Sequence, residues 1–221
     1  MSNKIIIYSH GFGVGKDDRG LFSDIAKVLP NEEHFMFDYN TIDTKNNTLL
    51  VSSLRTQTKK LIEVYRSVRK NNPKATVDLI AHSQGCVVAA LSLLKFRKSI
   101  FLAPPDSLNA ERMIKVFDRP DAKLNFNGVS RIPRKDSSTT LIPSDYWSSI
   151  RSLNLIKAFD LFSQNTELVV IKADDDEIVE MTNFTKLDDR IKFDHLKADH
   201  NFTGKSRNQL LDMIKKELGI A

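Results

Sequence analysis

Residues 76–94 read Thr76-Val-Asp-Leu-Ile-Ala-His-Ser-Gln-Gly-Cys-Val-Val-Ala-Ala-Leu-Ser-Leu-Leu94. The first part is a β-rich apolar run typical of a buried strand, and the last part is an apolar run of helical length. Ser83 lies at the junction, with the small residues Ala81 and Gly85 two positions away on either side. A strand, a sharp turn that carries Ser and a helix form a nucleophile elbow, where bulky flanking side chains would collide with the neighbouring strand and helix. Ala81 departs from the usual Gly but keeps the small size, so we predict that Ser83 is a nucleophile.

The rest of the chain alternates between strand-like and helix-like segments. Apolar β-rich runs occupy 5–8, 35–38, 77–81, 99–102, 168–172 and 191–193, and helical patterns occupy 21–29, part of 49–70, 85–96, 181–184 and 206–218. Buried β-rich runs separated by helices are typical of a parallel sheet that is covered on both faces. We therefore predict the α/β class, with a doubly wound, mostly parallel six-stranded sheet.

One region, from Pro104 to about Gln164, breaks this alternation. Within it, 131–143 predicts a hairpin or an extended loop, Ser144 is a plausible N-cap of a short helix, and 153–162 has a helical pattern. A long insertion at the active edge of an α/β sheet is most simply a cap, although a helical excursion that covers the sheet fits the same pattern. We expect a core of residues 1–105 and 165–221, and a cap or lid of residues 106–164.

Composition excludes several classes of function. The chain of 221 residues is 41% hydrophobic and 28% charged, which is typical of a soluble globular protein. It has no apolar run near the roughly 20 residues that span a bilayer, and its start does not resemble a signal peptide. The single cysteine, Cys86, reads as a small core residue, which suits a reducing compartment. We therefore expect a cytoplasmic protein with no membrane partner.

The net charge of +5 does not by itself indicate a nucleic-acid partner, because acidic residues alternate with the basic ones along most of the chain. The sequence has neither zinc-finger spacing nor an aromatic RNA-binding signature. The stretch Gly11-Phe-Gly-Val-Gly-Lys16 resembles a phosphate-binding loop, but His10 and Asp17 occupy positions where a Walker loop needs Gly and Ser or Thr. A dinucleotide-binding fingerprint needs Gly at position 16, where this chain has Lys. We expect no nucleic acid, no cofactor and no metal.

A nucleophilic serine needs a base and an acid that orients the base. Asp174, Asp175 and Asp176 follow the predicted strand 168–172, and the spacing favours Asp176 because Ile178 and Val179 can then return to the core. Asp174 and Asp175 stay open as alternatives.

The base is predicted to be His200, which lies in the loop after the last predicted strand. His34 and His195 lie at the ends of strands, and His10 precedes Gly11 at the end of the first strand. His82 neighbours Ser83, and its side chain should point away from the serine.

Acyl transfer also needs donors for an oxyanion, and the backbone N–H groups of Gln84 and Phe12 are the candidates. Gln84 begins the helix after the elbow, and Phe12 lies in the glycine-rich loop after the first strand. Aromatic residues could line an acyl pocket or could pack between the cap and the sheet; these are Phe12, Tyr146, Trp147, Phe159 and Phe162.

Four motifs together resemble the α/β-hydrolase superfamily, and most of all its small single-domain bacterial esterases. They are Ser9-His-Gly-Phe-Gly13, Ala81-His-Ser-Gln-Gly85, Asp174-Asp-Asp-Glu-Ile-Val179 and Asp199-His-Asn-Phe202. The family usually has two more strands before the His-Gly strand, so the resemblance implies a sheet trimmed to six strands. No specific relative is identified for the insertion.

The resemblance implies that Ser83 attacks a carbonyl carbon, that His200 takes its proton and that Asp176 orients His200. It implies hydrolysis of a small or medium carboxylic ester without a cofactor, and the partner is then a small-molecule ester. A thioesterase, a peptidase or an acyltransferase would use the same residues. A non-catalytic binding protein of the same fold is a further alternative, and the oligomeric state does not follow from the motifs.

Overall fold

The computed structural model describes residues 4–220, apart from 109, 118–119, 180–183 and 185–186. The helices and strands follow one another in this order: β1 (Lys4–Ser9), α1 (Leu21–Val28), β2 (Glu33–Phe35), β3 (Thr41–Asp43), β4 (Thr48–Leu50), α2 (Leu54–Asn71), β5 (Thr76–His82), α3 (Gln84–Ser92), β6 (Lys98–Leu102), α4 (Ala110–Phe117), β7 (Val129–Pro133), β8 (Thr139–Pro143), α5 (Ser144–Ser149), α6 (Leu155–Ser163), β9 (Glu167–Ala173), β10 (Lys192–Leu196) and α7 (Lys205–Leu218).

The main sheet has six parallel strands in the order β10-β9-β6-β5-β1-β2. Each strand corresponds to one of the six β-rich runs, and the predicted fold class is confirmed. Most of these runs are continuously apolar because helices bury both faces of the central strands.

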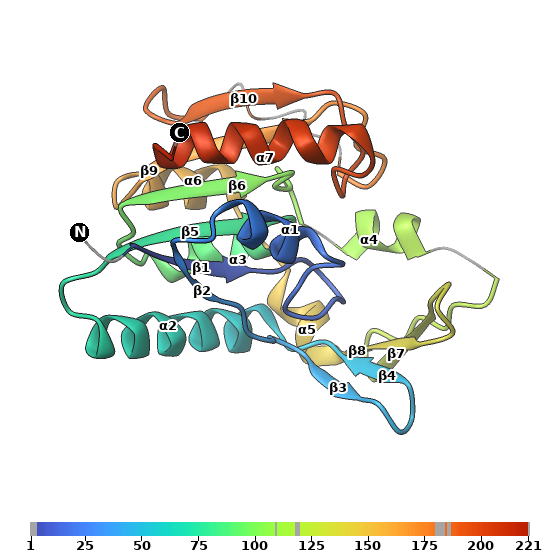
Figure 1. Ribbon diagram of the computed structural model, residues 1–221. Helices are drawn as coiled ribbons and strands as arrows, with labels where there is room; N and C mark the ends of the chain where they lie inside the picture. The colour runs from blue at the N-terminus through green and yellow to red at the C-terminus, as the bar shows by residue number, and fades with distance from the viewer. Residues whose placement is uncertain (1–3, 109, 118–119, 180–183, 185–186, 221) are drawn as a thin grey trace.

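Alternate side chains of each strand enter two separate cores. In β1, Ile5 and Ile7 join the core beneath α2, α3 and α6, whereas Ile6 and Tyr8 join the core beneath α1 and α7. Figure 1 shows these two helical layers on opposite faces of the sheet. Local sequence supports the helix ends, because the Ser53 side chain accepts a hydrogen bond from Thr56 N and Gly219 ends α7 with a φ of 67°.

A second sheet lies beyond the carboxyl ends of the main strands (Figure 1). Its order is β3-β4-β8-β7, and the parallel pairing of β4 with β8 joins segment 41–50 to segment 129–143. The predicted hairpin or extended loop at 131–143 is the β7–β8 hairpin. The helix expected within 49–70 begins only at Leu54, because Leu49 and Leu50 pair with β8.

The segment 106–164 contains two structurally different parts. Its first part holds α4 and the β7–β8 hairpin, and its last part holds α5 and α6. Phe159 and Phe162 of α6 pack on Phe101 of β6, with ring centroids 5.6 and 5.5 Å apart, so α6 belongs to the helical layer over the sheet. The short helical pattern expected near 181–184 falls mostly outside the described residues. No helix among the described residues has the length and hydropathy needed to span a bilayer.

Candidate active site

Ser83 occupies a strained turn between β5 and α3. Its φ of 51° and ψ of −125° are unusual for a residue with a side chain, and such a conformation costs about 1–3 kcal/mol. Hydrogen bonds hold the turn, since Ser83 N donates to Leu102 O at 2.9 Å and Cys86 N donates to Ser83 O at 3.0 Å. Gly85 is required sterically, because a Cβ atom there would lie 2.0 Å from the carbonyl oxygen of Ser9.

Hydrogen bonds join three of the predicted site residues in series. His200 Nε2 lies 3.0 Å from Ser83 Oγ, and His200 Nδ1 lies 2.7 Å from Asp176 Oδ2. Since a carboxylate only accepts, Nδ1 carries the hydrogen, and Nε2 can accept from the serine hydroxyl. The series lies at the carboxyl edge of the sheet, where β5, β9 and β10 end next to Ser83, Asp176 and His200.

The acid loop turns back into the core in the expected way. Asp176 Oδ1 accepts hydrogen bonds from Ile178 N at 2.8 Å and Val179 N at 2.7 Å, which leaves Oδ2 for His200. The other two aspartates do not reach the histidine. Asp174 is exposed and contacts His195 Nδ1 at 3.1 Å, and Asp175 is exposed as well.

A second histidine supports the site from behind. His82 points away from Ser83; its Nδ1 lies 2.9 Å from Asp18 Oδ2, and its Nε2 lies 2.9 Å from the backbone oxygen of His200. Both ring nitrogens therefore face acceptors, and only the doubly protonated imidazolium can donate to both. Asp18 Oδ2 also accepts from Gly11 N at 2.8 Å. This buried pair thus connects the loop after β1, the elbow and the loop that carries His200.

Each member of the Asp18–His82 pair stabilises the charged form of the other. Burial alone would lower the pKa of His82, but the Asp18 carboxylate and the two hydrogen bonds outweigh it and raise that pKa. Burial would likewise raise the pKa of Asp18, and the His82 charge with its hydrogen bond lowers it instead. The sequence analysis missed Asp18, whose partner lies 64 residues away. The two side chains are 2% and 1% exposed, so the pair is shielded from solvent.

The neighbouring His10 is neutral, in contrast to His82. Its Nε2 accepts a hydrogen bond from Tyr39 N at 3.0 Å, so Nδ1 carries the hydrogen and donates to Gly11 O at 2.9 Å. Burial lowers the pKa of His10. His10 therefore fixes the backbone of the loop that leads to Phe12.

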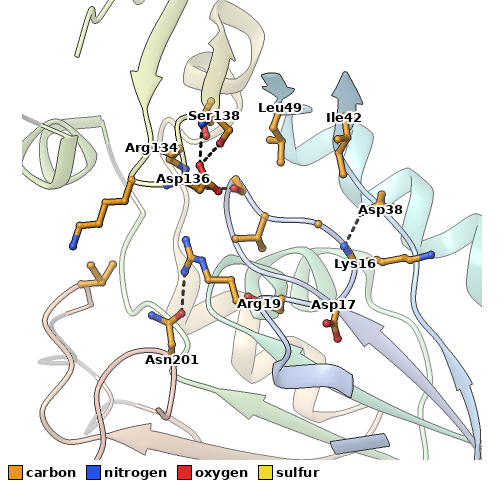
Figure 2. Close-up of a pocket in the computed structure, with 17 residues that line it drawn as sticks. Lys16, Asp17, Arg19, Asp38, Ile42, Leu49, Arg134, Asp136, Ser138 and Asn201 are labelled. Atoms are coloured by element: carbon orange, nitrogen blue, oxygen red, sulfur yellow. Dashed lines mark hydrogen bonds between the residues drawn. The ribbon is translucent and has the colours of Figure 1, made fainter. Parts of the chain in front are cut away.

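Three cavities adjoin the serine or open toward it. An apolar cavity of about 90 Å³ is lined by Ser83, Phe12, Gln84, Met113 and Phe117, among others. A second cavity of about 130 Å³, which we call the neck, is lined by Ser83 and His200 together with Arg19, Arg134 and Asn201. The neck shares several lining residues with a wide cavity of about 890 Å³, which we call the basin (Figure 2).

The two residues whose amides are expected to bind an oxyanion, Phe12 and Gln84, line the apolar cavity together with Ser83. Gln84 begins α3, and the leading N–H groups of a helix have no partner within it. No described residue accepts a hydrogen bond from the N–H of Phe12. The Gln84 side chain is anchored on both sides: Tyr146 OH donates to its Oε1, and its Nε2 donates to Gln57 Oε1 at 3.0 Å.

The structure does not bring Tyr146 and Trp147 to the surface of the cavities that reach Ser83. Both are almost fully buried. Tyr146 packs behind Phe12, with ring centroids 5.2 Å apart, and Trp147 Nε1 donates to Ser130 Oγ at 3.2 Å. Their side chains therefore support the wall behind Phe12, while Phe12 itself lines both cavities.

Comparison with known proteins establishes the fold. No protein-family model and no curated protein sequence matches the chain. Among solved structures, Est1E of Butyrivibrio proteoclasticus with bound ferulic acid is 13% identical at a TM-score of 0.72, and covers 98% of this chain and 88% of its own. The α/β hydrolase GrgF of Penicillium sp. sh18 is 16% identical at a TM-score of 0.68, and the match covers 99% of this chain and 91% of GrgF. An esterase of Pyrococcus furiosus is 15% identical at a TM-score of 0.68, and the match covers 99% of this chain and 81% of the esterase.

Proposed function

The chain has the α/β-hydrolase fold, and we propose that it is a serine hydrolase that cleaves a small or medium carboxylic ester through an acyl-enzyme intermediate. The observation that carries this proposal is the hydrogen-bonded series Asp176–His200–Ser83, which ends at a serine that lines two cavities. Structural neighbours that are esterases support the same class of reaction.

In the first half of the reaction, Ser83 Oγ bonds to the ester carbonyl carbon while His200 Nε2 takes the hydroxyl proton. The carbon–oxygen bond to the alcohol then breaks, and His200 gives the proton to the departing oxygen. In the second half, His200 takes a proton from water while the water oxygen bonds to the carbonyl carbon of the acyl-serine. The bond between that carbon and Ser83 Oγ then breaks, the carboxylic acid leaves, and His200 returns the proton to Oγ. Asp176 holds the Nδ1–H tautomer and stabilises the imidazolium throughout.

The carbonyl oxygen becomes negative in both halves, and we assign its stabilisation to the backbone N–H groups of Phe12 and Gln84. Loss of one such donor commonly lowers turnover by about 10²–10³-fold. The contacts of His10 and of the Gln84 side chain keep these two amides in place without reorganisation during the reaction.

The apolar cavity is the natural place for the acyl group. At about 90 Å³ it is smaller than the cavity of about 150 Å³ that holds benzene in an engineered protein, so a short acyl chain fits best. Met113 and Phe117 of α4 line it. Because α4 belongs to the 106–164 segment, we propose that this segment acts as the cap that selects the acyl chain.

The strain at Ser83 argues against a binding protein without catalytic activity. A φ of 51° costs free energy, and a glycine would relieve that cost where no hydroxyl is needed. Retention of a strained serine within 3.0 Å of His200 fits a nucleophile.

The test is labelling by a fluorophosphonate probe combined with turnover of short p-nitrophenyl esters. We expect stoichiometric labelling and turnover that Ser83→Ala abolishes and that His200→Ala lowers by several orders of magnitude. The matched control is His195→Ala, which removes an exposed histidine from the neighbouring strand and should leave turnover unchanged. Folded protein that neither reacts with the probe nor hydrolyses any ester would refute the proposal.

The acid is tested with Asp176→Asn against Asp174→Asn and Asp175→Asn. Only the first should lower turnover strongly, because Asp176 is the one of the three aspartates whose side chain contacts the His200 ring. Parallel assays with thioesters, aminoacyl amides and alternative acyl acceptors separate an esterase from a thioesterase, a peptidase and an acyltransferase.

A further inference from the structure

The neck and the apolar cavity meet at Ser83 but differ in one decisive residue. His200 lines the neck and does not line the apolar cavity. The oxygen of the leaving alcohol must receive its proton from His200, so it must come within hydrogen-bond distance of that ring. If the proposed hydrolysis holds, the alcohol part of the ester therefore occupies the neck, and a larger alcohol extends into the basin.

The neck carries positive charge. Arg19 and Arg134 line it, and the carboxylate among its lining residues, Asp18, is already paired with His82. Arg19 Nη1 donates to the neutral side chain of Asn201 at 3.0 Å, and Arg134 Nη2 donates to the carbonyl of Gly13 at 2.5 Å.

The other charged residues of the basin lie farther from the serine. Lys16, Lys135, Asp17, Asp38 and Asp136 line the basin but not the neck. Asp136 interacts with the charge of Arg134, so Arg19 is the better placed of the two arginines to meet a ligand. Figure 2 shows the Arg19 side chain directed toward Asn201, whereas the side chains of Lys16 and Asp17 point in other directions.

The backbone places Arg19 there at a cost. Asp18 and Arg19 both have a positive φ, of 46° and 58°, which L-residues with side chains adopt only under constraint. In this turn Asp18 is buried against His82. Arg19, the next residue in the chain, then lines the neck. The position of Arg19 is thus set by the same buried pair that supports His200.

We propose that Arg19, assisted by Arg134, binds an anionic group on the alcohol part of the substrate. The substrate class is then a carboxylic ester of a short acyl chain whose alcohol carries a carboxylate or a phosphate. A guanidinium binds both anions through parallel N–H donors. The inference rests on the proposed esterase function and adds to it the charge of the leaving group.

The experiment compares butyrate esters that differ only in the leaving group. The 4-carboxyphenyl and 4-carbamoylphenyl esters have similar shapes and differ by one charge. Each enzymatic rate is divided by the rate of hydroxide-catalysed hydrolysis of the same ester, which corrects for differences in intrinsic reactivity. The 4-phosphonooxyphenyl ester tells a phosphate preference from a carboxylate preference. The ratio of kcat/KM between charged and neutral esters is measured for the wild type, Arg19→Gln, Arg19→Lys and Lys16→Gln.

We expect the wild type to favour at least one anionic ester by about 10-fold at low salt, and 0.5 M NaCl to reduce this ratio because exposed charges are screened. Arg19→Gln should bring the ratio close to one, and because the ratio is taken within each variant, any change in hydrolysis of the neutral ester cancels. Arg19→Lys should keep part of the preference, and Lys16→Gln should keep all of it.

Turnover of the neutral ester with no anionic preference, or with a preference that Arg19→Gln leaves intact, overturns the subsite and leaves the esterase proposal standing. If the folded protein hydrolyses none of these esters and the fluorophosphonate probe does not label Ser83, the esterase proposal is overturned and the subsite with it. The two failures are therefore distinguishable by the neutral ester alone.

Discussion

Replacement of Asp18 by Ala should destabilise the protein far more than loss of a typical carboxylate. Asp18 Oδ2 accepts hydrogen bonds from Gly11 N at 2.8 Å and from His82 Nδ1 at 2.9 Å, in surroundings that exclude solvent. Its removal leaves a buried imidazolium and a buried amide without their acceptor. Breaking a buried charge pair in this way costs about 3–5 kcal/mol. Since domains are stable by about 5–15 kcal/mol, the variant should still fold.

The size of the effect should depend on pH. The pKa of His82 is raised above its ordinary 6.5, so its contribution is fully present below pH 6.5 and is lost as the pH rises through the folded-state pKa. The pKa of Asp18 is lowered below 3.8, so its contribution is present above pH 3.8 and is lost as the pH falls through the lowered value. The difference between wild type and Asp18→Ala should therefore be largest between pH 3.8 and 6.5 and should shrink in alkali.

The assay is urea unfolding at several pH values from 4 to 9, with turnover measured on the same samples. Asp18→Asn keeps an acceptor oxygen and the shape, so it should recover most of the stability in alkali and lose the pH dependence. Asp24→Ala is the control, because Asp24 and Lys27 are exposed and the partly buried Arg207 keeps its hydrogen bonds to the backbone oxygens of Phe202 and Asn201. Loss of the Asp24 side chain should cost under about 1 kcal/mol. A loss below about 1 kcal/mol for Asp18→Ala at pH 6 would refute the assignment of a charged pair.

Three further predictions concern the elbow and the apolar cavity. Gly85→Ala should abolish folding or lower the free energy of unfolding by about 3 kcal/mol or more, because its Cβ meets the backbone of Ser9, whereas Gly15→Ala should change the melting temperature little. Ser83→Gly should be more stable than Ser83→Ala by about 1 kcal/mol in urea unfolding, since glycine tolerates a φ of 51°; equal stabilities would argue against strain. Met113→Ala should raise kcat/KM for octanoate relative to butyrate esters several-fold by enlarging the apolar cavity, and Met213→Ala, which packs near the opposite core, should not.

The main sheet could be predicted because its signal is local. Each buried strand, such as 77–81 or 168–172, is an apolar run that is visible within a few residues. The carboxyl ends of parallel strands share one edge, so the loops with Ser83, Asp176 and His200 could be expected to meet there. The structure brings these three side chains into one hydrogen-bonded series.

The features that escaped prediction depend on contacts between distant residues. β3 and β4 have three residues each, and β4 is completed by β8, about 90 positions later in the sequence. The Asp18–His82 pair likewise has no periodic signal that sets Asp18 apart from other loop aspartates. The helix α4 does carry a helical period, with apolar residues at 110, 113, 114 and 117, and the sequence analysis overlooked it. The aromatic residues Tyr146 and Trp147 were ambiguous because aromatic side chains serve both in pockets and in cores.

Because β4 pairs with β8 and β6 pairs with β9, the chain can be cut into two fragments that share both sheets. A cut in the turn at Asn127–Gly128 leaves Ser83 on one fragment and Asp176 with His200 on the other. Each fragment then contributes strands to both sheets, so the two pieces have complementary edges through which they can reassociate. Under the proposed mechanism, neither piece hydrolyses an ester alone. Recovered turnover on mixing would make this protein a split reporter whose signal measures fragment complementation.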